Sequence, residues 1–382
     1  MVLIVDAIET ISLDSSMLGN LAARWARGGA ERESVENLWD TFVTNGIFPL
    51  LSWHHLTELL QHENYGVVLD RIRFLRSRSQ LAALKSLSDL PFGSIADLFA
   101  FECQVAIRGS AIDLEAVTAG VRNDVFSFAS GNELLSPYEL MWPELHRLVL
   151  SDMARAREIV AITTGQPVDM ASTPLSDFMN GRIASPAKSK SILSILERGL
   201  AEGVLKHGDR RLAESPEIIA SRFYDDVRSL APRFVAAYSE SPSEAMRLFN
   251  VSPSEFGPDA TFGDFLDLVM FRCRLGLAAE KLEIDASDLY EVSQSAIPSW
   301  NMERAIARYG QQRNEHKGSQ LNDRHLVCLA PYCLYTYVDK QTQEDVRRAK
   351  HFAPHLESAF HGTIKVTYEL EKIRSAISGS QT

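Results

Sequence analysis

The chain has 382 residues, enough for two or three domains of ordinary size and for a large buried core. Hydrophobic residues make up 45% of it and charged residues 23%, which excludes a disordered, collagen-like or coiled-coil protein. The net charge of −11 excludes a protein that coats nucleic acid through its overall charge, so any nucleic-acid site must be local. No apolar run approaches the roughly 18 residues of a membrane helix, and the four cysteines form no CxxC motif. We therefore expect a cytoplasmic protein that does not enter a membrane.

The first part of the chain alternates between predicted strands and helices. Val2–Val5 is a short apolar run, mostly β-branched, and predicts a buried strand that ends at Asp6. Ser52 is a good N-cap for the helix that follows a second apolar run. In chain order, the predicted elements are a strand over 2–5, helices over 15–44 separated at Gly28-Gly29, a strand over 47–51, and a helix from Trp53 to about His62.

The middle of the chain has a different character, because amphipathic helical patterns dominate it and strand-like alternation is scarce. Breaker-rich loops separate these patterns. The predicted helices cover 67–88, 94–108, 111–121, 137–162, 189–205, 216–239 and 262–281.

The alternation of strands and helices returns near the end. In chain order we expect a helix over 298–312, a short helix over 326–330, a strand over 333–338, a helix over 341–351 and a last strand over 362–368. The fold class we predict is α/β, predominantly helical overall, with a parallel sheet flanked by helices. Its α/β domain consists of residues 1–64 plus 298–370, and residues 65–297 form a large all-α insertion.

Four acidic residues occur where such a sheet could bring them together. Asp6 and Asp339 each follow a predicted strand, Glu58 lies on the helix after the second strand, and Asp323 precedes a short helix. The carboxyl ends of parallel strands form the ligand crevice of an α/β sheet. Clustered carboxylates repel one another unless a cation lies among them, and an oxygen-rich site suits Mg²⁺ or Mn²⁺. The alternative is that these acids are ordinary turn residues or helix caps.

The order of these acids and the motifs around them resemble those of PIN-like nucleases, although the 265 residues between Glu58 and Asp323 exceed the separation in a minimal PIN domain. The segment from Gly318 to Lys340, with Asp323, a Pro-Tyr turn, a strand and Thr-Tyr-Val-Asp339, resembles the third and fourth acidic motifs of that family. Leu3-Ile-Val-Asp6 resembles its first strand, and the helix that carries Glu58 resembles its second motif. The family's first Asp is usually followed by small polar residues, whereas Ala7 and Ile8 follow Asp6.

The resemblance implies a PIN-like fold and a metal-dependent endoribonuclease, with Asp6, Glu58, Asp323 and Asp339 as metal ligands and catalytic residues. It implies Mg²⁺ or Mn²⁺ as cofactor and single-stranded or structured RNA as substrate. A bacterial toxin or defence effector, a homodimer and a protein regulator are further expectations by analogy with the family.

Several basic residues are candidate substrate contacts. Arg71, Arg78 and Lys85 are spaced by seven and would share one face of the helix predicted over 67–88. Such a stripe suits phosphate, although an ordinary solvated face has the same pattern. Lys340 directly follows Asp339, and His325 lies two residues after Asp323. Either residue suits phosphate contact, and either equally suits the surface of a helix.

Two other interpretations remain open on the sequence. In the first, the protein is a PIN-like scaffold without catalytic activity that binds protein or RNA through its helical insertion, and the residues after Asp6 favour this. In the second, the segment from Gly318 to Lys340 resembles the family by chance, and the protein is a mostly helical interaction protein. In that case the two ends of the chain would not share one sheet.

Overall fold

The structure, a computed structural model, describes residues 8–108, 113–122, 124–164, 172–180, 186–208, 212, 214–311, 319–359, 362–367 and 369–379. These residues fall into two compact units. The first contains the described residues of 8–151, 277–311 and 322–379, and the second contains those of 152–276 and 319–321. Within the described residues, no helix is both long enough and apolar enough to cross a membrane.

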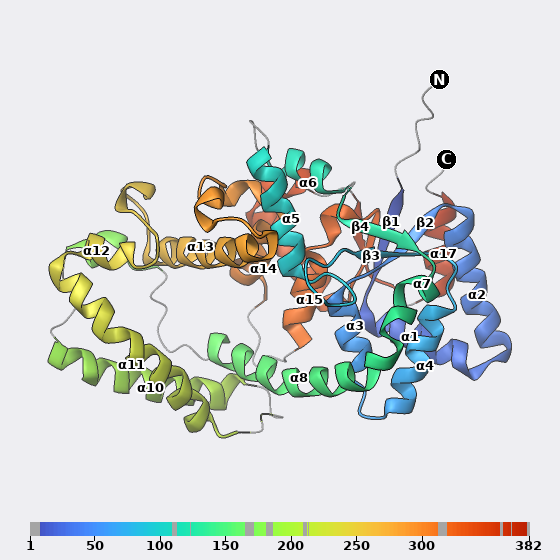
Figure 1. The fold of residues 1–382 in the computed structure, drawn as a ribbon, viewed down its shortest axis with the longest axis horizontal. Helices are drawn as coiled ribbons and strands as arrows, with labels where there is room; N and C mark the ends of the chain where they lie inside the picture. The colour runs from blue at the N-terminus through green and yellow to red at the C-terminus, as the bar shows by residue number, and fades with distance from the viewer. Residues whose placement is uncertain are drawn as a thin grey trace. The chain divides into compact units, whose positions relative to one another are not determined.

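The first unit is built on a six-stranded sheet with the strand order β4-β3-β2-β1-β5-β6 (Figure 1). All neighbouring strands are parallel except β3 and β4, which are antiparallel. The strands are β1 (Glu9–Leu13), β2 (Ile47–Leu51), β3 (Leu81–Leu84), β4 (Phe126–Ala129), β5 (Tyr335–Tyr337) and β6 (Thr363–Lys365). The two ends of the chain therefore share one sheet, which excludes the interpretation in which they lie apart.

Helices cover both faces of this sheet. Alternate residues of β1 point to opposite faces, so that Ile11 and Leu13 belong to a large core with the first group of helices. The first group is α1 (Ser15–Arg27), α2 (Gly29–Thr44), α3 (Trp53–Leu60), α4 (Tyr65–Arg76), α7 (Gly131–Leu135), α8 (Trp142–Thr164) and α17 (Leu370–Ser378).

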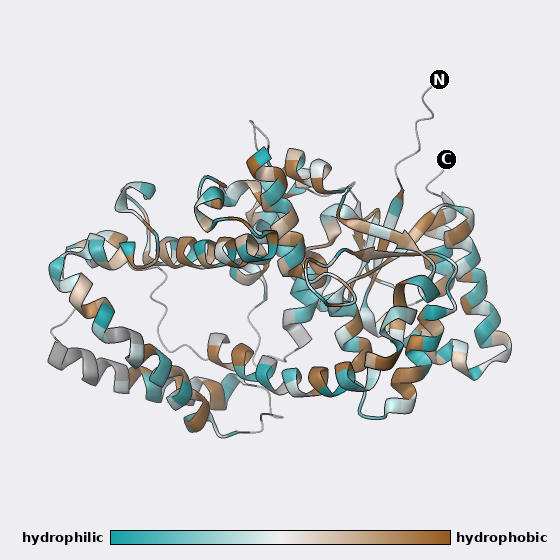
Figure 2. Ribbon diagram, in the orientation of Figure 1, coloured by the Kyte–Doolittle hydropathy of each residue, from teal (hydrophilic) through white to brown (hydrophobic). Residues whose placement is uncertain are grey.

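A second core, which includes Met302, Val327, Val338 and Val346, joins helices of the other group. This group is α5 (Ile95–Arg108), α6 (Leu114–Arg122), α14 (Pro298–Tyr309), α15 (Ser319–Val327) and α16 (Lys340–Phe352). Figure 2 shows hydrophobic and hydrophilic residues alternating along the helices around the sheet, as expected for helices with one buried face.

Most of the predicted elements of the first unit are confirmed. The helices over 15–44 separate at Gly28, where φ is +78°, and the helix after β2 begins with a capping box formed by Ser52 and His55. The predicted strands over 47–51, 333–338 and 362–368 correspond to β2, β5 and β6. Helix α17 was not predicted. The strand predicted over 2–5 lies outside the described residues.

The helix predicted over 67–88 is wrong in its second half. Helix α4 ends at Arg76, and Leu81–Leu84 form strand β3 instead. All four residues of β3 are buried, since β2 and β4 flank the strand and its faces are covered. A strand buried on both faces is a continuous apolar run, which periodicity alone does not distinguish from a piece of helix. Strand β4 lies in the same predicted insertion, so residues 65–151 belong to the unit that contains the sheet.

The second unit is helical. It contains part of α8, part of α13 (Phe262–Leu282), and the helices α9 (Leu175–Met179), α10 (Pro186–His207), α11 (Pro216–Glu240) and α12 (Pro242–Arg247). Helices α10 and α11 pack against each other around Leu200, Val204, Ile219 and Ala220. The all-α character expected for the middle of the chain is thus found in this unit, although it begins about 90 residues later than predicted.

Candidate functional site

The strand order creates one favourable place for a ligand. The chain passes from β1 outward to β2 and β3 on one side, and from β5 to β6 on the other. The direction therefore reverses between β1 and β5, and the carboxyl ends of two such strands leave a crevice where α/β proteins bind ligands. The residues that follow β1, β2 and β5 are the ones to examine first.

Asp14 directly follows β1 and was not among the predicted residues. Its backbone N–H donates to the carbonyl of Tyr337, the last residue of β5, at 3.0 Å. Its side-chain Oδ1 caps α1 by accepting from the backbone N–H of Ser16 at 2.7 Å and from the Ser16 hydroxyl. Asp14 is half-buried and lies at the crevice between β1 and β5.

Glu58 lies on α3 and points toward the same place. Its Oε1 accepts a hydrogen bond from Asn322 Nδ2 at 3.2 Å, which joins α3 to α15 across the site. Burial raises the pKa of Glu58, and the negative charge of Asp14 raises it further, whereas the Ser15 hydroxyl and the Asn322 amide oppose this. Because the charge of Asp14 affects the pKa of Glu58, the two carboxylates lie in one partly desolvated region.

Asp339 completes the arrangement from the β5 side. It follows β5 and caps α16, because its Oδ1 accepts from the backbone N–H of Thr342 at 2.6 Å. Like Asp14, it uses only one carboxylate oxygen for capping. Within the described residues, Oδ2 of each aspartate accepts no hydrogen bond, so both oxygens are available to a ligand.

Two histidines contact each other between α3, the helix of Glu58, and α15. The rings of His54 and His325 have centroids 4.5 Å apart. Burial lowers the pKa of His54 well below its usual value, and the charge of His325 lowers it further. The neutral His54 accepts from the backbone N–H of Ile95 at Nε2, with a distance of 3.1 Å, so its proton is on Nδ1. His325, predicted as a phosphate contact, therefore packs on α3 next to the acids.

The structure brings together only part of the predicted acidic set. Asp339 lies just past the carboxyl end of β5, and Glu58 lies on α3, the helix that follows β2; β1 separates these two strands. Asp6 lies outside the described residues. Asp323 is half-buried inside α15 rather than before a short helix, and it is its neighbour Asn322 that reaches Glu58.

Asp14 and Asn322 were missed by the sequence reasoning. A usable signal existed for Asp14, because Ser15 and Ser16 follow it and small polar residues are what the family pattern has after its first Asp. No comparable signal existed for Asn322.

The three basic residues predicted on one helix face do not share a helix. Arg71 lies on α4, Arg78 follows that helix, and Lys85 follows β3. Arg71 donates from Nη1 to the carbonyl of Leu59 at 2.8 Å, and Lys85 donates from Nζ to the carbonyl of Asp124 at 2.5 Å. The predicted stripe is therefore wrong, because a turn and a strand interrupt the helix that it required.

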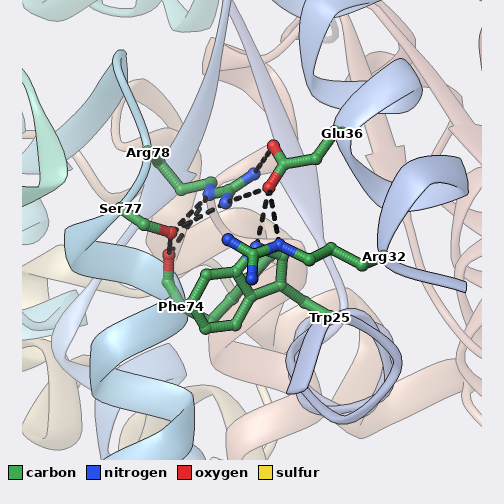
Figure 3. A network of polar contacts seen from close by, with 6 residues as sticks. All are labelled: Trp25, Arg32, Glu36, Phe74, Ser77 and Arg78. Carbon is green, nitrogen blue, oxygen red and sulfur yellow. Dashed lines mark hydrogen bonds and ion pairs between the residues drawn. The ribbon is translucent and has the colours of Figure 1, made fainter. Parts of the chain in front are cut away.

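Arg78 is a core residue (Figure 3). Its side chain is only 3% exposed and makes a bidentate pair with Glu36, at 2.8 and 3.0 Å. Its guanidinium carbon lies 4.7 Å from the ring centroid of Phe74 and 5.2 Å from that of Trp39. Burial alone would raise the pKa of Glu36, but the hydrogen bonds from Arg78 and Trp25 lower it on balance. The guanidinium is thus committed to contacts within the fold.

Lys340 is the first residue of α16 and is exposed next to Asp339. Of the basic residues predicted as substrate contacts, it is the one that lies exposed beside the acids at the carboxyl end of β5.

The donor atoms at this site suit a hard divalent cation. Asp14, Glu58 and Asp339 offer carboxylate oxygens, and the buried Ser15 hydroxyl lies beside Glu58 without a geometrically ideal hydrogen bond. Among the described residues, no group of three or more His, Cys, Asp or Glu side chains is placed to hold a metal ion, so at most two of these carboxylates would contact it directly. Mg²⁺ does not need more, because proteins usually hold it through one or two carboxylates, water and substrate phosphates. The residues fit Mg²⁺ or Mn²⁺ in this sense.

Comparisons with protein families, with curated proteins and with solved structures found no match to this chain.

Proposed function

We propose that the protein is a metal-dependent endoribonuclease of PIN-like type, which hydrolyses phosphodiester bonds at the crevice between β1 and β5. The observation that carries this proposal is the position of Asp14 and Asp339 just past the carboxyl ends of the neighbouring parallel strands β1 and β5, at the reversal of strand order, with Glu58 of α3 close enough to Asp14 for its pKa to be affected. The PIN-like fold is part of the proposal and is supported by the parallel sheet and by the order of the acidic residues.

Each residue has a role that follows from its position. Asp14 and Asp339 would each contribute the carboxylate oxygen that capping does not occupy. Glu58, held by Asn322, is a carboxylate whose raised pKa suits it to accept a proton from an attacking water. Lys340 is placed to contact a substrate phosphate. A bound Mg²⁺ or Mn²⁺ would supply acidification of water and neutralisation of phosphate charge.

RNA as the substrate and a role in toxicity or defence rest on the family resemblance alone, as do the homodimer and the protein regulator. A cytoplasmic location is supported by the cysteines, because no disulfide joins any of the four.

The test is cleavage of single-stranded and structured RNA by the full chain, with Mn²⁺, with Mg²⁺ and with EDTA. Asp14→Asn and Asp339→Asn should each lower cleavage at least about 100-fold, since each removes an oxygen ligand or a charge at the reacting centre. Asp40→Asn is the matched control, because Asp40 is an exposed acid on α2. Asp6→Asn separates the two assignments of the first acid and should leave cleavage intact.

Unchanged cleavage by Asp14→Asn and Asp339→Asn would refute the site. One observation favours another function: among the described residues, no group of three or more acidic, histidine or cysteine side chains is placed to hold a metal ion. The alternative is a scaffold without catalytic activity that binds protein or RNA. It predicts no metal-dependent cleavage, and calorimetry with Mn²⁺ would show no binding that Asp14→Asn abolishes.

A further inference from the structure

A groove on the surface of α16 is separate from the acidic site. It has a volume of about 400 Å³ and is lined by Glu344, Arg347, Arg348, His351 and Phe352. This volume lies within the range of small-ligand sites. All the lining residues come from one helix, between its fifth and its last residue, whereas Asp339 caps the beginning of the same helix.

An exposed aromatic ring forms one wall of this groove. Phe352 is 55% exposed and stacks on Tyr309 of α14, with ring centroids 5.2 Å apart and an interplanar angle of 23°. The guanidinium of Arg308 lies over the Tyr309 ring, 5.7 Å from its centroid. Stacking on Tyr309 thus supports the Phe352 ring. Single exposed apolar residues are common and need no function, so the neighbouring charges decide the interpretation.

The charges beside Phe352 are mostly positive, although the chain as a whole is acidic. Arg347 pairs with Glu344 at 2.6 Å, and Lys350 pairs with Glu357 of the segment that follows α16. Arg348 makes no hydrogen bond or ion pair within the described residues, although its charge helps to lower the pKa of Glu344 after the larger effect of Arg347. The imidazole of His351 contacts the edge of Phe352, with ring centroids 4.9 Å apart, and Arg308 lies over the neighbouring Tyr309. An arginine without a fixed anionic partner beside an exposed ring is the combination that binds single-stranded nucleic acid.

We propose that the α16 groove binds a nucleotide of a single-stranded nucleic acid, with the base stacked on Phe352 and the phosphate held by Arg348. Stacking does not depend on the identity of the base, so this site would bind with little sequence preference. Helix α16 is about 19 Å long, a distance that a few nucleotides span. A strand bound here can therefore extend to Asp339. That the bound nucleic acid is also the substrate rests on the proposed function, whereas binding of nucleic acid in the α16 groove does not.

The test is binding by the full chain in EDTA, measured by fluorescence anisotropy with a labelled oligouridylate of about 15 nucleotides, the upper end of single-strand site sizes. Phe352→Ala should weaken binding about 10-fold, and Phe352→Tyr should restore it, whereas Phe352→Leu should not. Arg348→Gln should reduce the slope of log affinity against log salt by about 0.7. Arg73→Gln is the matched control, since Arg73 is an exposed arginine paired with Asp70 on α4. It should bind as the wild type does.

Three results would overturn the inference. They are wild-type affinity in both Phe352→Ala and Arg348→Gln, full rescue by Phe352→Leu, and equal binding of an RNA duplex of the same length. Because EDTA removes metal from the assay, binding is measured independently of cleavage. An enzyme that cleaves RNA but binds unchanged after Phe352→Ala would refute this inference and leave the proposed function standing. A protein that binds RNA through Phe352 but does not cleave it would refute the proposed function and leave this inference standing.

Discussion

Arg78 offers the sharpest test of whether a basic residue serves the fold or the substrate. In the structure its guanidinium lies over the ring of Phe74 and pairs with Glu36 (Figure 3). The ring of Trp39 also lies close to it. Arg78→Ala removes the two hydrogen bonds to Glu36, each worth about 1.5–3 kcal/mol. It also removes the hydrogen bonds to the Phe74 carbonyl and the Ser77 hydroxyl, which water can partly replace, and cation–π contacts worth about 1 kcal/mol. Glu36 is 40% exposed and regains water in the variant, which reduces the loss. We expect a decrease in the free energy of unfolding of about 3 kcal/mol.

The assay is urea unfolding followed by tryptophan fluorescence, since Trp25 and Trp39 both lie next to Arg78. Glu36→Gln should cost about 2 kcal/mol because it leaves a buried guanidinium without its counter-charge. The double variant Arg78→Ala/Glu36→Gln should cost clearly less than the sum, with a coupling energy of at least about 1 kcal/mol. Arg73→Gln, the exposed control, should stay within about 0.5 kcal/mol of the wild type. Had Arg78 evolved to bind phosphate, Arg78→Ala would leave stability unchanged and weaken RNA binding. That pair of results would refute the core assignment.

Two predictions concern pH. Because the pKa of Glu58 is raised, a proton competes with the metal for this carboxylate, and Mn²⁺ affinity measured by calorimetry should fall as pH decreases. Glu58→Gln should make Mn²⁺ affinity less dependent on pH. An equal pH dependence of Mn²⁺ affinity in the wild type and in Glu58→Gln would contradict this prediction. Burial raises the pKa of Glu102 to about 7, above its value of about 4.5 in the unfolded chain, so its contribution to stability is complete below pH 4.5 and is lost as pH rises through 7. Glu102→Gln should remove up to about 3 kcal/mol of this pH dependence in urea unfolding between pH 5 and 8, and an unchanged profile would show that Glu102 is ionised in the fold.

The sequence predicts local structure well where the signal is local. The separation of α1 and α2 at Gly28 and the N-cap Ser52 are both encoded by adjacent residues, and both are confirmed. Strand β3 was missed because its four residues, Leu-Ala-Ala-Leu, have no alternation, and only burial on both faces identifies them as a strand. The apolar run Val2–Val5 predicts a strand that ends at Asp6, and these residues lie outside the described part of the chain, where β1 covers Glu9–Leu13 and precedes Asp14. The polar residues Thr10 and Ser12 of β1 are buried, so that this strand lacks the continuous apolar pattern of a buried strand.

The position of the candidate site depends on long-range contacts that the spacing of its acidic residues along the sequence does not reveal. Asn322 and Asp339 lie on either side of Tyr332, which fixes the connection between α15 and β5. The backbone carbonyl of Tyr332 accepts from the Thr10 hydroxyl at 2.9 Å, and its own hydroxyl donates to Glu102 at 2.6 Å.

Glu102 in turn accepts from the backbone N–H of Ser299 on α14 at 3.1 Å, so β1, α5 and α14 all converge on this one turn. Each of these partners is more than 200 residues from Tyr332 or lies on a different helix. Buried polar networks of this kind specify geometry only when every member is satisfied. A substitution at Thr10 or Tyr332 should therefore displace Asp339 from Asp14 without touching either carboxylate, and this is why acidic spacing alone does not locate the site.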